Sequence, residues 1–236
     1  MSEPYLSEAC VVLKRLPYKE NDAHLVLFGP SLGKFLALAK GVRKPESKLS
    51  SLLDVGNFIE AALYEGKGGY TLTSATQLDG FRRRYASYAA LLTSVALCEL
   101  VDAMVAPGDV DEDVYHLLLK TLERMDDGNI ADVRLAFFWE MLLLSGYASA
   151  EEADFAALLQ AYWHRQAFTL EEQMIFDELS VFFCHAGTHP HLDALHLSKR
   201  GRRVMRAVID SALKEHLGLS LKSKKILDEA TAQFYS

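Results

Sequence analysis

Positively charged side chains gather at three places in the sequence, and their type and spacing suit one chemistry. Clustered ammonium and guanidinium groups neutralise phosphates, so they bind nucleic acid through its backbone and without regard to base sequence. One cluster lies in GKFLALAKGVRKPESKLS, the next is an arginine triplet, and the last lies in LKSKK. The predicted phosphate-binding residues are Lys34, Lys40, Arg43, Lys44 and Lys48, then Arg82, Arg83 and Arg84, and finally Lys222, Lys224 and Lys225.

Each cluster also has a plainer interpretation, which the sequence alone leaves open. The first and last are equally consistent with lysines that keep a surface soluble, and the triplet with salt bridges to acidic residues. A basic triplet at the start of a helix opposes the helix dipole, which favours a role outside helix stability. Phe35, Tyr64 and Tyr70 have the type to stack on bases, but aromatic residues in strands are more often core, and we predict core.

The distribution of charge matters more than its sum. The formal net charge is −7, which argues against a globally basic nucleic-acid binder. Residues 99–178 hold eighteen acidic and four basic side chains, whereas residues 197–225 hold nine basic and two acidic ones. We therefore expect strongly polarised faces, with nucleic acid confined to the basic ones.

A histidine-rich segment, CHAGTHPHLDALH, is the one stretch that resembles a metal site. It contains Cys184, His185, His189, His191 and His196. Imidazole and thiolate groups suit zinc, but Gly187 and Pro190 interrupt the helix that would bring His185 and His189 onto one face. We predict a neutral surface loop, no metal and no other cofactor, and keep a metal hydrolase as the alternative from a different class.

Catalytic and membrane signatures are missing from the sequence. It has no phosphate-binding P-loop, no dinucleotide-binding glycine motif, no nucleophile elbow and no H-E-x-x-H, so we predict that the protein is not an enzyme. The three cysteines are odd in number and far apart, which fits a reducing compartment. The most apolar stretch is interrupted by Glu99 and Asp102, so we expect a cytoplasmic protein with no membrane span.

The elements that would position these residues change in kind near residue 80. Short apolar runs at 9–16, 23–28, 35–39, 58–64 and 70–76 are separated by glycine-containing turns, which predicts five strands. Five strands in about eighty residues favour a closed barrel, because closure removes exposed edges. Helical spacing follows, with helices expected at 130–144, 150–163, 169–183, 199–217 and 221–234 after two earlier ones. The predicted fold is α+β, with a five-stranded OB-fold barrel over residues 1–80 and an all-helical domain over 81–236.

The whole chain resembles the bacterial RecO family in the order of its landmarks. They are VLKRLPYKENDAHLVLF, GKFLALAKGVRKPESKL, FIEAALYEGKGGYTLTSAT, RLAFFWEMLLLSGY and HLGLSLKSKKIL. The sequence departs from many members in lacking a four-cysteine zinc module after Gly-Tyr, where it has only Cys184. Other members lack the module, so the departure removes zinc and leaves the resemblance intact.

The resemblance implies a mediator of homologous recombination and DNA repair. RecO-like proteins bind and anneal DNA strands and act with RecR to help RecA load on DNA coated by the single-stranded-DNA-binding protein, SSB. The implied partners are single- and double-stranded DNA, RecR and the acidic SSB tail, with RecF and RecA in the same pathway, and the location is cytoplasmic and nucleoid-associated. The alternative is a generic OB-fold protein that binds RNA or other oligonucleotides.

Recognition of the SSB tail requires a cation beside an apolar pocket, because that peptide ends in an apolar residue and a free carboxylate. Arg134 stands nearly alone as a cation in the acidic segment, with Phe138 and Met141 on the same helical face. Arg134 and Phe138 are therefore the first candidates, and Arg203, with Arg200 and Arg206, is the next. The alternative is that Arg134 pairs internally with Asp132 or Glu123.

Overall fold

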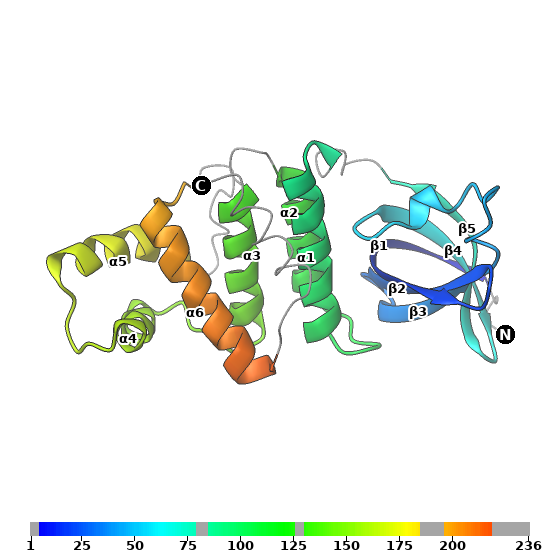
Figure 1. Cartoon of the computed structure of the whole chain (residues 1–236). Coiled ribbons are helices and arrows are strands. Elements are labelled where there is room, and N and C mark those ends of the chain that lie inside the picture. Colours follow the sequence, from blue (N-terminus) through cyan, green and yellow to red (C-terminus); the bar gives the residue numbers. More distant parts are fainter. Residues whose placement is uncertain (1–4, 79–84, 126–129, 185–195, 219–236) are drawn as a thin grey trace. The chain divides into compact units, whose positions relative to one another are not determined.

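The N-terminal part of the chain is a closed five-stranded barrel. The computed structural model describes residues 5–78, 85–125, 130–184 and 196–218. The strands follow the order β1-β2-β3-β5-β4 around the barrel, and only β3 and β5 run parallel (Figure 1). This is the OB-fold topology and confirms the prediction. The strands are β1 (Tyr5–Tyr18), β2 (Asp22–Gly29), β3 (Gly33–Ala39), β4 (Phe58–Gly66) and β5 (Gly69–Gln77).

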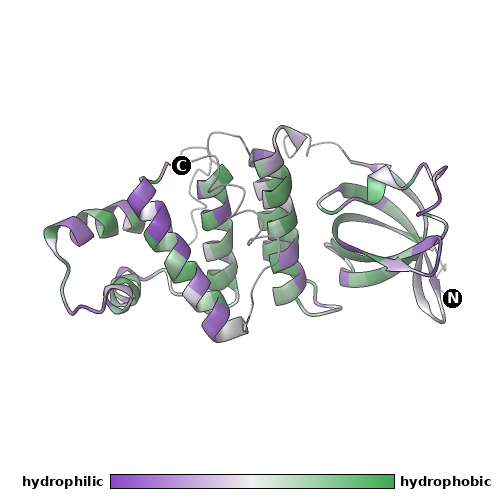
Figure 2. Ribbon diagram, in the orientation of Figure 1, coloured by the Kyte–Doolittle hydropathy of each residue, from purple (hydrophilic) through white to green (hydrophobic). Residues whose placement is uncertain are grey.

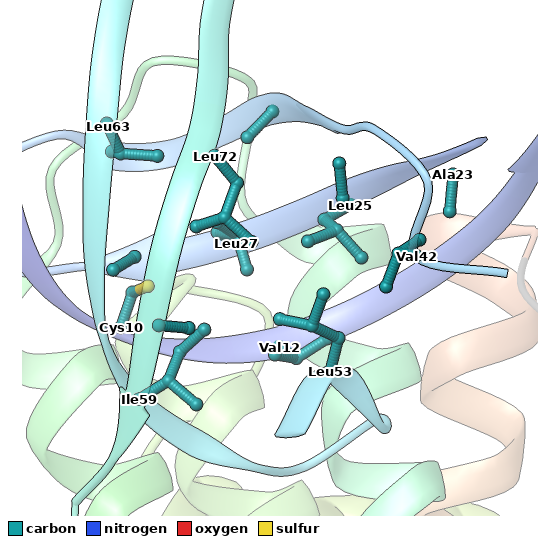
Figure 3. Packing of buried hydrophobic residues seen from close by; sticks show 14 of the residues in the cluster. Cys10, Val12, Ala23, Leu25, Leu27, Val42, Leu53, Ile59, Leu63 and Leu72 are labelled. Atoms are coloured by element: carbon teal, nitrogen blue, oxygen red, sulfur yellow. The ribbon is translucent and has the colours of Figure 1, made fainter. Parts of the chain in front are cut away.

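The long strand β1 closes the barrel because it is bent and pairs with both β4 and β2. The first half of β1 pairs with β4 and its second half with β2, with a register shift between Val12 and Lys14. Such an irregularity bends a strand, so one strand can serve both neighbours. Inward residues fill the interior, together with Val42 and Leu53 from the β3–β4 connection (Figure 3). Phe35 belongs to this core and Tyr70 packs against it, as predicted, whereas Tyr64 is 39% exposed.

Two helices pack with the barrel in one compact unit, α1 (Tyr88–Met104) and α2 (Glu112–Arg124). The Ser87 side chain caps α1 by accepting a hydrogen bond from the Ala90 N–H. The Asp111 side chain caps α2 by accepting one from the Val114 N–H. Helix α1 lies against β1, and the Tyr115 hydroxyl of α2 donates to the Ala9 carbonyl at 2.8 Å. The barrel and these helices therefore share packing and hydrogen bonds.

The second compact unit is helical and consists of α3 (Ile130–Leu144), α4 (Glu152–Trp163), α5 (Leu170–Phe183) and α6 (Lys199–Leu217). Thr169 and Glu172 form a capping box at the start of α5, the helix predicted over 169–183. Asp132 of α3, fully buried, accepts two hydrogen bonds from the Arg202 guanidinium of α6, at 2.6 and 2.8 Å. Figure 2 shows how hydrophilic much of α6 is, in keeping with its basic sequence.

The predicted elements agree closely with the observed ones. All five strands are present, and α3 and α6 begin and end as predicted. The last predicted helix, 221–234, lies outside the described residues. Packing groups α1 and α2 with the barrel and begins the second unit at residue 124. The division into a barrel domain over residues 1–80 and a helical domain over 81–236 stays a prediction.

Candidate nucleic-acid interface

The basic loop, residues 40–57, is fastened to the barrel where it leaves β3. The Gly41 N–H donates to the Asp22 carboxylate at 2.8 Å, and the Arg43 N–H donates to the Asn21 carbonyl at 2.9 Å. Between these two bonds, the Val42 side chain is buried in the barrel core. The first turn of the loop is therefore held against the β1–β2 connection.

The far end of the loop is fixed in a similar way. A short 3-10 helix, η1 (Ser51–Leu53), inserts Leu53 into the barrel, where it is fully buried. The Asn57 side-chain amide donates to the carbonyls of Ser51 and Leu52 at 2.9 and 3.0 Å. The Arg15 guanidinium, from β1, donates to the Ser50 carbonyl at 2.8 Å. With both ends held, little chain entropy remains to be lost when the loop binds a ligand.

Between its anchors the loop presents its cations to solvent. Lys40, Arg43, Lys44 and Lys48 are all exposed. The Arg43 guanidinium also donates to the Lys19 carbonyl at 3.1 Å, so it lies beside the β1–β2 turn. Lys19 adds a further ammonium, 5.3 Å from the centre of the Tyr18 ring. Phosphate groups could thus be met by ammonium and guanidinium groups from two adjacent connections.

An apolar and aromatic row runs along the outside of the barrel beside this loop. Register places Leu16, His24 and Leu38 opposite one another on β1, β2 and β3. Tyr18 stacks on His24, with ring centres 4.2 Å apart and planes 23° from parallel. Leu16 is 41% and Tyr18 37% exposed. Exposed rings beside cations are the usual means of binding single strands without sequence preference.

Sequence reasoning missed this row and also missed Arg15 and Lys19. The predicted strand ended at Leu16, whereas β1 continues to Tyr18, so that Leu16 and Tyr18 alternate and share one face. What the sequence could not show is that β1 and β2 bring Tyr18 against His24.

Lys34 was predicted to bind phosphate, and the structure corrects that prediction. Its side chain is only 8% exposed, and its ammonium group donates to the Asp102 carbonyl at 2.5 Å, with the Asp102 carboxylate at 3.4 Å. Lys34 is the second residue of β3, at the opposite end of that strand from Lys40. It joins the barrel to α1 and does not belong to the basic loop.

Arg134 and Phe138 were predicted to hold the SSB tail, and this prediction is also corrected. Arg134 is 3% and Phe138 2% exposed, so neither presents a surface to a peptide. The cause is that α3 is apolar around most of its circumference and is buried on most sides. Asp132, the internal partner considered for Arg134, is engaged by Arg202. Arg203, the next candidate, is exposed on α6 and stays a prediction.

Several predicted residues lie outside the described part of the chain. They are the triplet Arg82, Arg83 and Arg84, the lysines Lys222, Lys224 and Lys225, and the histidines His185, His189 and His191. Within the described ranges, no group of three His, Cys, Asp or Glu side chains could hold a metal ion. The absence of a metal remains a prediction, because the histidine cluster falls in the gap between 184 and 196.

Where the surroundings shift a side-chain pKa among the described groups, the shift is away from neutral pH. Burial raises the pKa of the Cys10 thiol and of the Tyr115 hydroxyl, and it raises the pKa of Cys184 to about 11. A hydrogen bond from the Thr169 backbone N–H lowers the pKa of Glu172. Cys10 and Cys184 are therefore protonated near neutral pH. Nucleophilic chemistry would need the thiolate instead.

The closed five-stranded barrel places this part of the chain in the OB-fold class, and its anchored basic loop is a candidate nucleic-acid site. Two family profiles match the chain, "Recombination protein O N terminal" over residues 1–81 and "Recombination protein O C terminal" over residues 85–225. The chain belongs to the RecO family. None of the helices in the described ranges is long and apolar enough to cross a membrane.

Similar proteins from several bacteria share one name. The chain is 31% identical over 139 residues to "DNA repair protein RecO" of Clostridium perfringens, a match that covers 58% of this chain and 56% of that protein. It is 30% identical over 149 residues to the protein of that name in Dehalococcoides mccartyi, covering 62% and 59%. The matched region thus spans little more than half the length of each relative.

Proposed function

We propose that this chain is a DNA-repair and recombination mediator that binds single-stranded DNA on its barrel and is not an enzyme. The observation that carries the proposal is the anchored loop, which exposes Lys40, Arg43 and Lys44. Its Arg43 guanidinium donates to the Lys19 carbonyl, next to the Tyr18–His24 stack. Cations give affinity for phosphates and rings give a platform for bases. Membership of the RecO family supports the step from nucleic acid in general to DNA repair.

The proposed reaction is physical and no covalent bond changes. Two complementary strands, each held by its phosphates, are brought together and pair, and the duplex leaves because its bases no longer reach the rings. We propose that the protein is cytoplasmic and associated with the nucleoid. There it would act on SSB-coated strands, together with RecR, to help RecA load. Double-stranded DNA and a RecF-like protein are further proposed partners. Exposed Arg203 is the proposed contact for the SSB tail.

An annealing assay tests this function. Complementary DNA strands, bare or coated with SSB, are mixed with the protein, and duplex formation is followed by fluorescence transfer. We expect faster annealing of both, and slower annealing with Tyr18→Ala, because a stacked base is worth roughly 1–3 kcal/mol, or about five- to 150-fold in affinity. Tyr64→Ala is the matched control, since Tyr64 is similarly exposed but lies beside Tyr5, at the other end of β1.

The outcomes separate the candidate functions. Annealing of bare strands but not of SSB-coated ones, together with equal binding of RNA, would favour the generic OB-fold binder. No binding to any single strand would end the proposal. A metal hydrolase would instead reveal itself as stoichiometric zinc in the purified protein by elemental analysis.

A further inference from the structure

The helical unit contains a groove that the barrel's proposed function does not use. Its volume is about 730 Å³, and it lies among α3, α4, α6 and the connection after α3. Trp139, Phe155 and Val208, all buried, form its floor. Tyr147, Leu158 and Tyr162 line it while remaining 37–41% exposed. An apolar floor with exposed apolar walls is typical of a surface that receives another apolar group.

The groove is built from parts that are held in place. The Trp139 indole N–H donates to the Phe183 carbonyl at 3.0 Å, and the Trp139 ring packs edge-on against Phe155. The indole's only polar group is therefore satisfied, so what remains for a ligand is its apolar ring. On the other wall, the N–H groups of Tyr147 and Ala148 both donate to the Leu142 carbonyl. The groove is thus preformed, which lowers the entropic cost of binding.

Charge at the groove selects the kind of ligand. Asp154 of α4 and Glu215 of α6 line it and are exposed, and the described lining residues include no lysine or arginine. Glu151 and Glu152 lie just before Asp154 and are also exposed. The basic residues next to the lining in sequence are Arg165, which has Glu172 at 3.5 Å, and the exposed Lys214, which precedes Glu215 and is outside the lining. A ligand with positive charge is favoured, and an acidic peptide or a nucleic acid is disfavoured.

We propose that this groove docks a peptide segment of a partner protein that places an apolar side chain on Trp139 and Phe155 and directs lysine or arginine at Asp154 and Glu215. The tyrosines at the walls assist, because aromatic faces attract cations. The proposal rests on the second unit alone and does not depend on the DNA-binding role of the barrel. It also makes this groove a poor site for the acidic SSB tail, which would bring carboxylates to carboxylates.

Two matched peptides test the proposal on the full chain. One fluorescent peptide carries leucine, phenylalanine and arginines, and its twin has glutamates in place of the arginines. Binding is measured by fluorescence anisotropy at low salt. We expect the basic peptide to bind and the acidic twin to bind at least tenfold more weakly, because rim charges decide between them. A Trp163→Phe protein, in which Trp139 is the only tryptophan, should change its emission when the basic peptide binds.

Variants of the groove separate docking from general charge attraction. Asp154→Asn with Glu215→Gln should weaken binding roughly three- to tenfold, as expected for two exposed ion pairs. Glu46→Gln with Glu65→Gln removes the same charge from the barrel and should have no effect. Leu158→Asp should abolish binding, whereas Leu170→Asp, at a residue of α5 that is 84% exposed and outside the groove, should not.

Three results would overturn the proposal. They are equal or tighter binding of the acidic twin, unchanged affinity in the two groove variants with helicity intact by circular dichroism, or equal losses in the control variants. Because the DNA affinity of each variant is measured in parallel, failure of the groove and failure of the barrel's proposed function are distinguishable.

Discussion

Lys34 and Lys14 both direct an ammonium group at Asp102, but from different surroundings. Lys14 is 51% exposed and lies 3.0 Å from the carboxylate, where water competes for both charges. Lys34 is 8% exposed and donates chiefly to the Asp102 backbone carbonyl. A buried hydrogen bond from a charged group stabilises more than an exposed ion pair, since its removal leaves a desolvated partner. The two lysines should therefore differ in their contribution to stability.

Replacing each lysine with methionine tests this difference and the correction made for Lys34. Lys34→Met should lower the free energy of unfolding by about 1.5–3 kcal/mol, and Lys14→Met by about 1 kcal/mol or less. Urea titration followed by circular dichroism measures both. Affinity for single-stranded DNA should be unchanged in folded Lys34→Met. A loss of DNA affinity without a loss of stability would return Lys34 to the phosphate site.

The elements of the barrel unit are joined by a short backbone ladder at the start of β3. The Lys34 N–H donates to the Asp109 carbonyl at 3.1 Å, and the Gly108 N–H donates to the Lys34 carbonyl at 2.7 Å. The α1–α2 connection thereby pairs with β3, and Gly33 makes the approach close. Gly33 has φ +62°, and a Cβ at this position would overlap the Asp109 carbonyl.

Gly33→Ala should therefore destabilise the barrel unit more than the same change at Gly41. Gly41 has a similar φ of +67°, but a Cβ there would meet only the Lys44 side chain, at ordinary contact distance. Both variants carry the left-handed backbone strain of about 1–2 kcal/mol, and Gly33→Ala adds a steric cost of about 1–3 kcal/mol. Thermal and urea unfolding compare them. Equal losses would mean that the α1–α2 connection does not pack on β3 as described.

Local sequence patterns predicted the helices and strands well. Features that depend on long-range contacts could not be predicted from them. Short apolar runs and turn glycines located all five strands, and helical spacing located α3 and α6, because these signals lie within a few residues of the element. Burial of Lys34 depends on Asp102, 68 residues away, and no local pattern encodes it. The same holds for Arg134, which local reasoning placed on a surface. Among the described loop cations, Lys40, Arg43, Lys44 and Lys48 are exposed as a phosphate site requires.

At the scale of the whole molecule, the two units carry different candidate binding surfaces. The unit that contains the barrel carries the anchored basic loop and the exposed ring stack, while the helical unit carries an apolar groove with Asp154 and Glu215 in its lining. A net charge of −7 is compatible with DNA binding because the acidic residues are concentrated in 99–178. Salt screens long-range repulsion between exposed charges, so a local basic surface can dominate DNA binding.

Salt dependence of single-stranded DNA binding tests this account most directly. The double variant Lys40→Gln, Lys44→Gln is compared with Lys120→Gln, Lys214→Gln, which removes two exposed lysines elsewhere. Affinity for an oligothymidylate is measured by anisotropy across salt concentrations. We predict that the loop variant binds more weakly and that its plot of log affinity against log salt is flatter by about 1.4, from about 0.7 for each lost phosphate contact, while the control keeps the wild-type slope. A wild-type slope and affinity in the loop variant, or equal flattening in the control, would contradict the assignment of the barrel loop as the DNA site.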